Sequence, residues 1–226
     1  MGGEDQRHSG GANPCPAHGS RFAAGEDPVK REKILDGART VFMAQGFDAA
    51  SMNDIVREAG VSKGTIYVYF ENKEQLFGAL IARERDRFAT EMRKAVARYD
   101  HVEEALDHYG RALTAHMCGK GTICAMRNVI AVAGRMPGLT RGFFRSAPAT
   151  IRTVLKEMID REVKNGRLVA EDTDLAARQF IDLATGTFLK FRLFGEMPEP
   201  PTPEEIAYTT GEAVKTFMAR YGTGPA

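Results

Sequence analysis

The sequence predicts an all-α protein of about nine helices, with a small N-terminal domain followed by a larger helical one. Apolar residues recur at helical spacing, and no stretch alternates apolar and polar residues as a half-buried strand does. Capping residues together with Gly and Pro divide the chain into segments of helical length. The length of 226 residues suits one domain of roughly 50 residues and another of roughly 150.

The first predicted helix follows an N-terminal arm. Residues 1–26 are dense in Gly, Pro and Ser and lack apolar periodicity, so we expect a disordered arm outside the fold. Asp27 can cap a helix that has Pro28 at its first position, and Gly46 offers a left-handed terminator at the other end. The apolar positions at helical spacing between them are Ile34, Ala38, Val41 and Phe42.

Two short helices joined by a tight turn come next. Ser51 can accept a hydrogen bond from a backbone N–H of the first turn of one helix, which ends at Gly60. Gly60 can take a positive φ in the turn, and Ser62 can cap a following helix over 63–70. Two short helices around a glycine turn are typical of a helix-turn-helix.

A long fourth helix links the two domains. Asn72 can cap it, with Gln75 at the position that completes a capping box. We therefore divide the folded chain into a helix-turn-helix domain at 27–73 and a larger helical domain at 74–226. The apolar stripe of this helix comprises Leu76, Phe77, Leu80, Ile81, Phe88, Met92 and Val96.

The rest of the chain is also predicted to be helical. Asp100 and Glu103 form a candidate capping box for a helix from Val102. The segment Thr202-Pro203-Glu204-Glu205 combines an N-cap, a first-position Pro and a capping Glu, which indicates the start of the last helix. The later helices are expected at about 121–134, 147–165, 173–194 and 203–221.

Composition restricts the class of protein. With 43% hydrophobic and 27% charged residues, the chain resembles a soluble globular protein. It lacks an apolar run near the roughly 20 residues of a membrane span, and its start lacks a signal peptide, so we expect a cytoplasmic location. The net charge of +1 leaves DNA binding open, because a compact motif needs only a local cluster of donors and cations. Three cysteines without CxxC spacing favour reduced thiols, and we expect no metal or other cofactor.

The predicted third helix carries side chains suited to DNA. A helix that enters the major groove needs short donors at its start, and the segment Ser62 to Thr65 supplies them. Gly64 lacks a side chain where the backbone would approach DNA closely, while Tyr67 and Tyr69 can offer hydroxyls to phosphates. The alternative is that both tyrosines merely cover the core.

The segment from Lys30 to Phe77, and above all AGVSKGTIYVYFENKEQLF, resembles the N-terminal DNA-binding domain of the TetR family of bacterial repressors. The resemblance implies that Lys73 and Tyr67 hold phosphates. It also suggests that Lys63, Thr65 and Val68 meet bases. The positions that correspond to DNA contacts of the family are Ser51, Lys63, Gly64, Thr65, Tyr67, Tyr69 and Lys73.

From about Phe143 onward the chain resembles the C-terminal domains of the AefR-like subgroup of the same family. The resemblance implies that the last two helices pair with those of a second subunit in a four-helix bundle. The alternative is that these apolar stripes pack only within the monomer. The predicted dimer-interface residues are Ala176, Phe180, Leu183, Thr187 and Phe191 on one helix and Ile206, Ala213 and Phe217 on the other.

An apolar set between the two regions could line a pocket for a hydrophobic ligand, because flexible Met side chains adapt to ligands. The same residues could equally be ordinary core. The candidate pocket residues are Tyr109, Leu113, Met117, Met126, Ile130, Phe143 and Phe144.

Together these features predict a homodimeric repressor that a small, hydrophobic effector releases from a palindromic operator. It would associate with the bacterial nucleoid when bound there. An enzyme is disfavoured, because GxSxG, HExxH, P-loop and GxGxxG patterns are missing from the sequence. The remaining alternative is a helical protein-interaction module without specific DNA readout.

Overall fold

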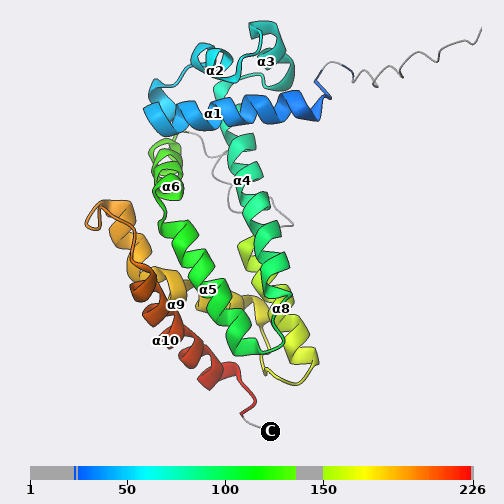
Figure 1. The fold of residues 1–226 in the computed structure, drawn as a ribbon, viewed down its shortest axis with the longest axis vertical. Coiled ribbons are helices and arrows are strands. Elements are labelled where there is room, and N and C mark those ends of the chain that lie inside the picture. The colour runs from blue at the N-terminus through cyan, green and yellow to red at the C-terminus, as the bar shows by residue number, and fades with distance from the viewer. Residues whose placement is uncertain (1–22, 24, 136–149, 225–226) are drawn as a thin grey trace, which may run out of the picture.

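The computed structural model describes residues 23, 25–135 and 150–224, and within them the chain is all-α, as predicted (Figure 1). A single backbone bridge joins Leu168 to Gly222 in these ranges. The predicted arm at 1–26 falls largely outside the described residues. The helices are α1 Pro28–Ala49, α2 Met52–Ala59, α3 Lys63–Tyr69, α4 Lys73–Val96, α5 Val102–Cys118, α6 Lys120–Val132, α8 Ile151–Lys164, α9 Thr173–Phe194 and α10 Pro203–Tyr221.

The predicted N-cap bonds form, although the Gln75 side chain accepts from the backbone N–H of Glu71 and does not complete a capping box with Asn72. Side-chain oxygens of Asp27, Ser51, Ser62, Asn72 and Thr202 each accept a backbone N–H in the first turn of α1, α2, α3, α4 and α10, respectively. These bonds satisfy amide groups that have no partner within the helix, so local sequence sets where each helix begins.

Two predicted helix ends need correction. Gly46 has the expected positive φ of 78°, but helical structure resumes beyond it, and α1 continues to Ala49 with a kink at this glycine. The capping box at Asp100 and Glu103 is absent, because the N-cap of α5 is His101, which makes no side-chain cap bond. Val102, the first residue of α5, is buried at 4% exposed.

The N-terminal domain packs around an aromatic cluster. The rings of Phe42 and Phe77 meet edge to face with centroids 4.9 Å apart, and Phe47 lies 5.0 Å from Phe77. Helices α1 and α2 cross closely at Gly37, where a Cβ would lie 2.7 Å from the Cβ of Ala59. Aromatic packing and this close crossing hold the three N-terminal helices against the start of α4.

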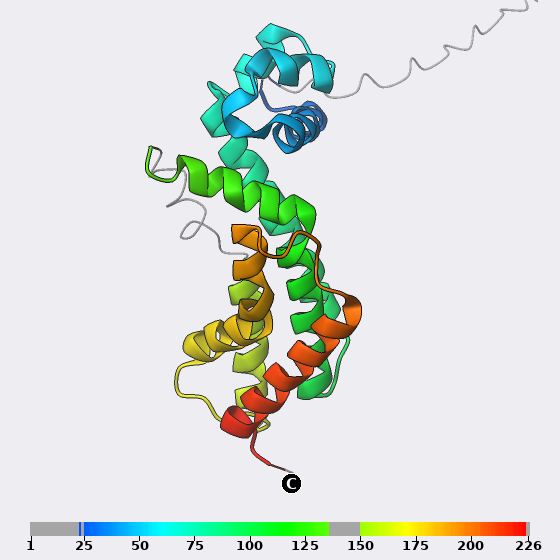
Figure 2. The same ribbon diagram turned by 90° about the vertical axis from the view of Figure 1, so that its left-hand side faces the viewer.

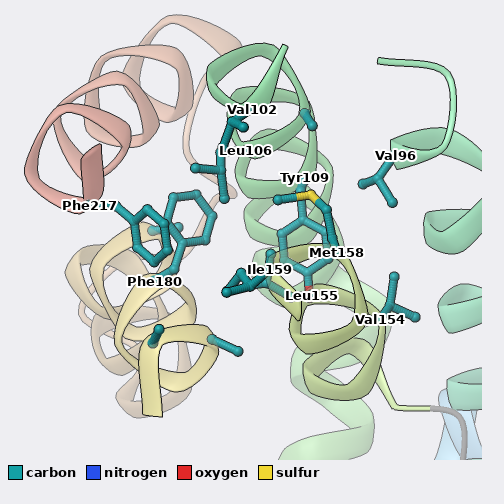
Figure 3. Close-up of a cluster of buried hydrophobic side chains, with 14 of the residues drawn as sticks. Val96, Val102, Leu106, Tyr109, Val154, Leu155, Met158, Ile159, Phe180 and Phe217 are labelled. Atoms are coloured by element: carbon teal, nitrogen blue, oxygen red, sulfur yellow. The ribbon is translucent and has the colours of Figure 1, made fainter. Parts of the chain in front are cut away.

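The C-terminal domain has a second core, built where α5 packs against α4, α9 and α10 and where α8 packs against α4 and α9. Figure 3 shows the rings of Phe180 from α9 and Phe217 from α10 side by side, with Tyr109 of α5 among the side chains of α8. Helices α9 and α10 run next to each other along one side of the molecule (Figure 2). No described helix has the length and apolar character needed to cross a membrane.

Candidate nucleic-acid interface

Helix α3 has one buried and one exposed face. Ile66 is fully buried, and Phe70, the C-cap residue of α3, is 3% exposed. Both side chains therefore face the core, as a helix-turn-helix requires. On the opposite face Lys63 is exposed, and Tyr67 and Val68 are 45% and 52% exposed. Figure 1 places this helix at the outer end of the molecule, opposite the C-terminal domain. Its exposed side is therefore free to meet a large partner.

Gly64 on this face is not needed by the fold. A Cβ added there would meet nothing closer than the Ser62 Oγ at 3.9 Å, and its φ is not positive. Glycine in a helix costs roughly 0.5–1 kcal/mol relative to alanine. A partner outside the molecule that approaches the backbone closely would explain its presence.

Ser51 and Ser62 both act as caps, with different consequences. The Ser51 hydroxyl donates to Asp54 at 2.5 Å and accepts from its backbone N–H at 3.2 Å. The Ser51 hydrogen bond, and then Arg57, hold the pKa of Asp54 below its ordinary value. Because the single hydroxyl proton of Ser51 is used within the domain, Ser51 has no side-chain donor left for the DNA contact that the family resemblance implies. The Ser62 hydroxyl is exposed and lies 2.7 Å from that of Thr65.

Lys73 also differs from the prediction. Its ammonium donates to the carbonyl oxygens of Phe47 at 2.7 Å, Asp48 at 3.2 Å and Ala50 at 2.9 Å. It also lies 4.5 Å from the ring centroid of Phe47. Three bonds use all the protons of a lysine, so this side chain closes the C-terminal end of α1 and is not a free phosphate clamp.

Tyr69 belongs to the domain interior rather than to the exposed face. Its hydroxyl donates to the backbone carbonyl of Asp27 at 3.2 Å, and the side chain is half-buried. The alternative interpretation, that this tyrosine covers the core, is therefore correct for Tyr69. Tyr67, in contrast, remains accessible.

Val68 on the exposed face has a neighbour outside α3. A Cβ on Gly25 would be 3.2 Å from the Val68 Cγ1, so Gly25 lies beside this side chain.

The predicted ligand-pocket residues differ in burial within the described structure. Tyr109 and Leu113 are fully buried, and the Tyr109 hydroxyl donates to the Ile151 carbonyl at 2.6 Å, so both are core residues. Burial raises the pKa of Tyr109 well above its ordinary value. Ile130 is 60% exposed, and Met117 and Met126 are half-buried. Phe143 and Phe144 lie outside the described residues.

Two surface hollows occur elsewhere in the C-terminal domain. One of about 460 Å³ lies between α9 and α10, with Leu183 and Arg220 in its wall. The other, of about 520 Å³, lies between α5 and α10, with Asp107 and Gly211 in its wall. Neither includes a residue of the predicted ligand pocket.

The predicted dimer interface divides into two sets. Five of its members are buried in the core of the monomer and are corrected to core residues, because a second subunit cannot reach them: Ala176, Phe180, Ile206, Ala213 and Phe217.

The other three members remain on the surface of α9. Leu183 is 41% exposed, Phe191 is 53% exposed, and Thr187 is also exposed. Sequence reasoning missed two neighbours on this face, Gly186 and the 85% exposed Phe194. The helical spacing from Leu183 to Phe191 could have identified both. A Cβ on Gly186 would meet nothing within 4 Å.

Comparisons with known proteins agree with this geometry. The model for bacterial regulatory proteins of the tetR family matches residues 34–80, and that for the C-terminal domain of AefR-like transcriptional repressors matches 104–223. The uncharacterized HTH-type transcriptional regulator YfiR of Bacillus subtilis (strain 168) is 33% identical over 85 residues, which are 38% of this chain and 41% of YfiR.

Two solved structures share the fold over most of the chain. A putative TetR-family transcriptional regulator from Mesorhizobium loti has a TM-score of 0.79 at 24% identity, covering 87% of this chain and 98% of the other. The flavonoid-responsive regulator FrrA has a TM-score of 0.66 at 26% identity, covering 88% of this chain and all of the other chain (100%).

Proposed function

Because the chain belongs to the TetR family of bacterial transcriptional regulators and is not an enzyme, we propose that it is a homodimeric repressor of a palindromic operator. A small hydrophobic effector would release it from the DNA. We place it in the cytoplasm, at the nucleoid when it is bound to the operator. The single observation that carries the proposal is the exposed face of α3, which combines a glycine, a lysine and a tyrosine that the fold itself does not use.

For DNA readout we propose a contact set smaller than the one implied by the sequence. Lys63 and Tyr67 can donate to phosphates or base edges, and Val68 can contact thymine methyl groups. Gly64 allows the backbone to approach closely. Ser62 and Thr65 complete the set of short donors at the start of α3. Ser51, Tyr69 and Lys73 are left out, because their donors are occupied within the domain.

For the dimer we propose that α9 crosses its counterpart in a second copy near Gly186. The exposed apolar side chains of Leu183 and Phe191 flank this glycine along the helix. A glycine with open space above it allows two helix backbones to approach closely, and two symmetry-related readers match a two-fold operator.

For the effector we propose an apolar small molecule bound in the C-terminal domain. Support comes from the likeness to FrrA, which is described as flavonoid-responsive. Release requires that the effector bind more tightly to the DNA-free arrangement. A preference of roughly 1–3 kcal/mol would change operator affinity by about 5- to 150-fold.

Selection of bound sequences from a random duplex library by the purified full chain tests the DNA-reading role. We expect an enriched palindrome whose affinity falls by about 5- to 150-fold in Lys63→Ala and in Tyr67→Ala, since each loses a direct contact worth about 1–3 kcal/mol. Lys94→Ala, an exposed lysine at the far end of α4, is the matched control and should bind as wild type. A lack of enrichment at low salt would favour the interaction-module alternative.

A further inference from the structure

Helix α6 is attached to the N-terminal domain through both apolar and charged side chains. Val129 and Val132, 6% and 1% exposed, are part of the buried cluster around Phe42. Just beyond the helix, one guanidinium nitrogen of Arg135 lies 3.0 Å from each carboxylate oxygen of Asp48. The end of α6 is thus a component of the core of the DNA-binding domain.

The same helix is also attached to the end of α9. The Nε of Arg127 donates to the Leu193 carbonyl at 3.0 Å, and one of its terminal nitrogens donates to the Arg192 carbonyl at 2.7 Å. These carbonyls belong to the last turn of α9, where helical partners are missing and the helix dipole favours a cation. Arg127 therefore caps α9 from a neighbouring helix.

A reciprocal arginine strengthens this junction. Arg192 of α9 is 3% exposed, and its Nε donates to the carbonyl of Cys118, the last residue of α5, at 2.9 Å. Its other donors reach the carbonyls of Met197 at 2.7 Å and Pro198 at 2.6 Å in the turn before α10. The joint between α5 and α6 and the end of α9 are consequently held together from both sides.

The second connection between the domains is α4, which is continuous from one to the other. Arg83 of α4 binds Glu32 at 3.0 Å and Asp36 at 2.9 Å on α1. A domain joined through one helix can tilt about it, whereas a second attachment point fixes the tilt. Figure 2 shows the end of α9 directly below α6, with the DNA-binding domain above.

We propose that α6 is a strut that sets the orientation of the DNA-binding domain relative to α9, with Arg127 as its positioning residue. Loss of the two Arg127 bonds would release α6 from the end of α9, while the packing of Val129 and Val132 keeps it attached to the DNA-binding domain. The consequence for operator binding rests on the proposed function, because α9 is the proposed dimer face. The orientation itself is a property of one protomer.

The test measures the distance between two spin labels within one protomer, at Glu58→Cys in the DNA-binding domain and Lys164→Cys at the end of α8, both exposed. Cys15→Ser and Cys124→Ser remove competing thiols, while burial raises the pKa of the remaining Cys118 thiol and keeps it unreactive. Labelled protein is diluted with unlabelled full chain, so that only distances within a protomer contribute.

We expect a single narrow distance distribution in the parent protein and a broadened one in Arg127→Met, with unchanged helix content. Arg127→Lys, which keeps a cation and a donor, should restore the narrow distribution. The control Arg111→Met removes an exposed arginine that pairs with Asp107 and should have no effect. An unchanged distribution in Arg127→Met, or equal broadening in Arg111→Met, overturns the proposal.

Operator affinity is the second readout. If the parent binds a selected operator, we expect Arg127→Met to bind it several-fold more weakly. If the parent binds no operator, the proposed function fails, but the distance measurement still decides whether α6 orients the domain. The two failures are therefore distinguishable.

Discussion

At the scale of single residues, Gly64 separates the requirements of the fold from those of DNA. Gly64→Ala should leave the free energy of unfolding unchanged or raise it by up to about 1 kcal/mol, because a Cβ there meets no neighbour. The same change should weaken operator binding at least about tenfold by blocking close approach. Gly211→Ala, also in a helix with open space around it, is the control and should leave operator binding unchanged. Thermal unfolding and titration of operator DNA measure the two effects.

Two lysines ten positions apart, Lys63 and Lys73, have opposite predicted roles. Lys73→Met should lower the free energy of unfolding by about 1–2 kcal/mol, because three carbonyls lose a charged donor, and should change operator affinity little at temperatures where the variant is folded. Lys63→Met should weaken operator binding and change the free energy of unfolding little, since Lys63 is exposed on α3. Denaturant unfolding and DNA titration on both variants check this prediction, and an operator defect in folded Lys73→Met would restore the phosphate-clamp interpretation.

At the scale of an element, the end of α8 depends on a buried carboxylate. Burial by itself raises the pKa of Glu162, but hydrogen bonds from Arg161 and Arg167 outweigh it and lower the pKa below its ordinary 4.5. A depressed folded pKa means that the stabilisation is complete above the unfolded value and is lost as pH falls through the folded one.

Glu162→Gln should therefore lower Tm at neutral pH and flatten the decline of Tm as the pH falls below about 5. At neutral pH we expect the free energy of unfolding of Glu162→Gln to be about 1–3 kcal/mol lower than that of wild type. This loss is smaller than for a fully buried ion pair, because both arginines are half-exposed. Glu157→Gln, an exposed partner of Arg93, should follow the wild-type profile. If the curves of Tm against pH for wild type and Glu162→Gln are parallel, the lowered pKa of Glu162 does not stabilise the fold.

At the scale of the whole molecule, the exposed face of α9 should control assembly. Leu183→Glu combined with Phe191→Glu should convert a dimer into a folded monomer, because both side chains are exposed in one protomer and would meet like charges across the seam. Operator affinity should fall by about 100-fold or more once the two readers are no longer linked. Val169→Glu, at a 62% exposed position outside this face, is the control. Analytical ultracentrifugation measures the mass of the particle in solution. A variant that stays dimeric would show that the dimer interface is not on this face of α9.

Much of the fold and part of the site follow from the sequence alone. Ser62 caps α3 through Thr65, and Ile66 and Phe70 face inward while Lys63 and Tyr67 face outward. These features depend on residues within one or two helical turns, where spacing decides which side chains share a face. The all-α class and the last two helices, with bounds 173–194 and 203–221, were predictable for the same reason.

Only the tertiary structure decided how distant donors and apolar faces are used. Lys73 reaches carbonyls 23 to 26 residues away, and the Tyr69 hydroxyl reaches one 42 residues away, so neither role is visible in local sequence. Phe180 and Leu183 belong to one amphipathic stripe, yet the fold buries the first and leaves the second 41% exposed. Periodicity determines that a helix has an apolar face, but the neighbouring helices determine which part of that face remains for a second subunit.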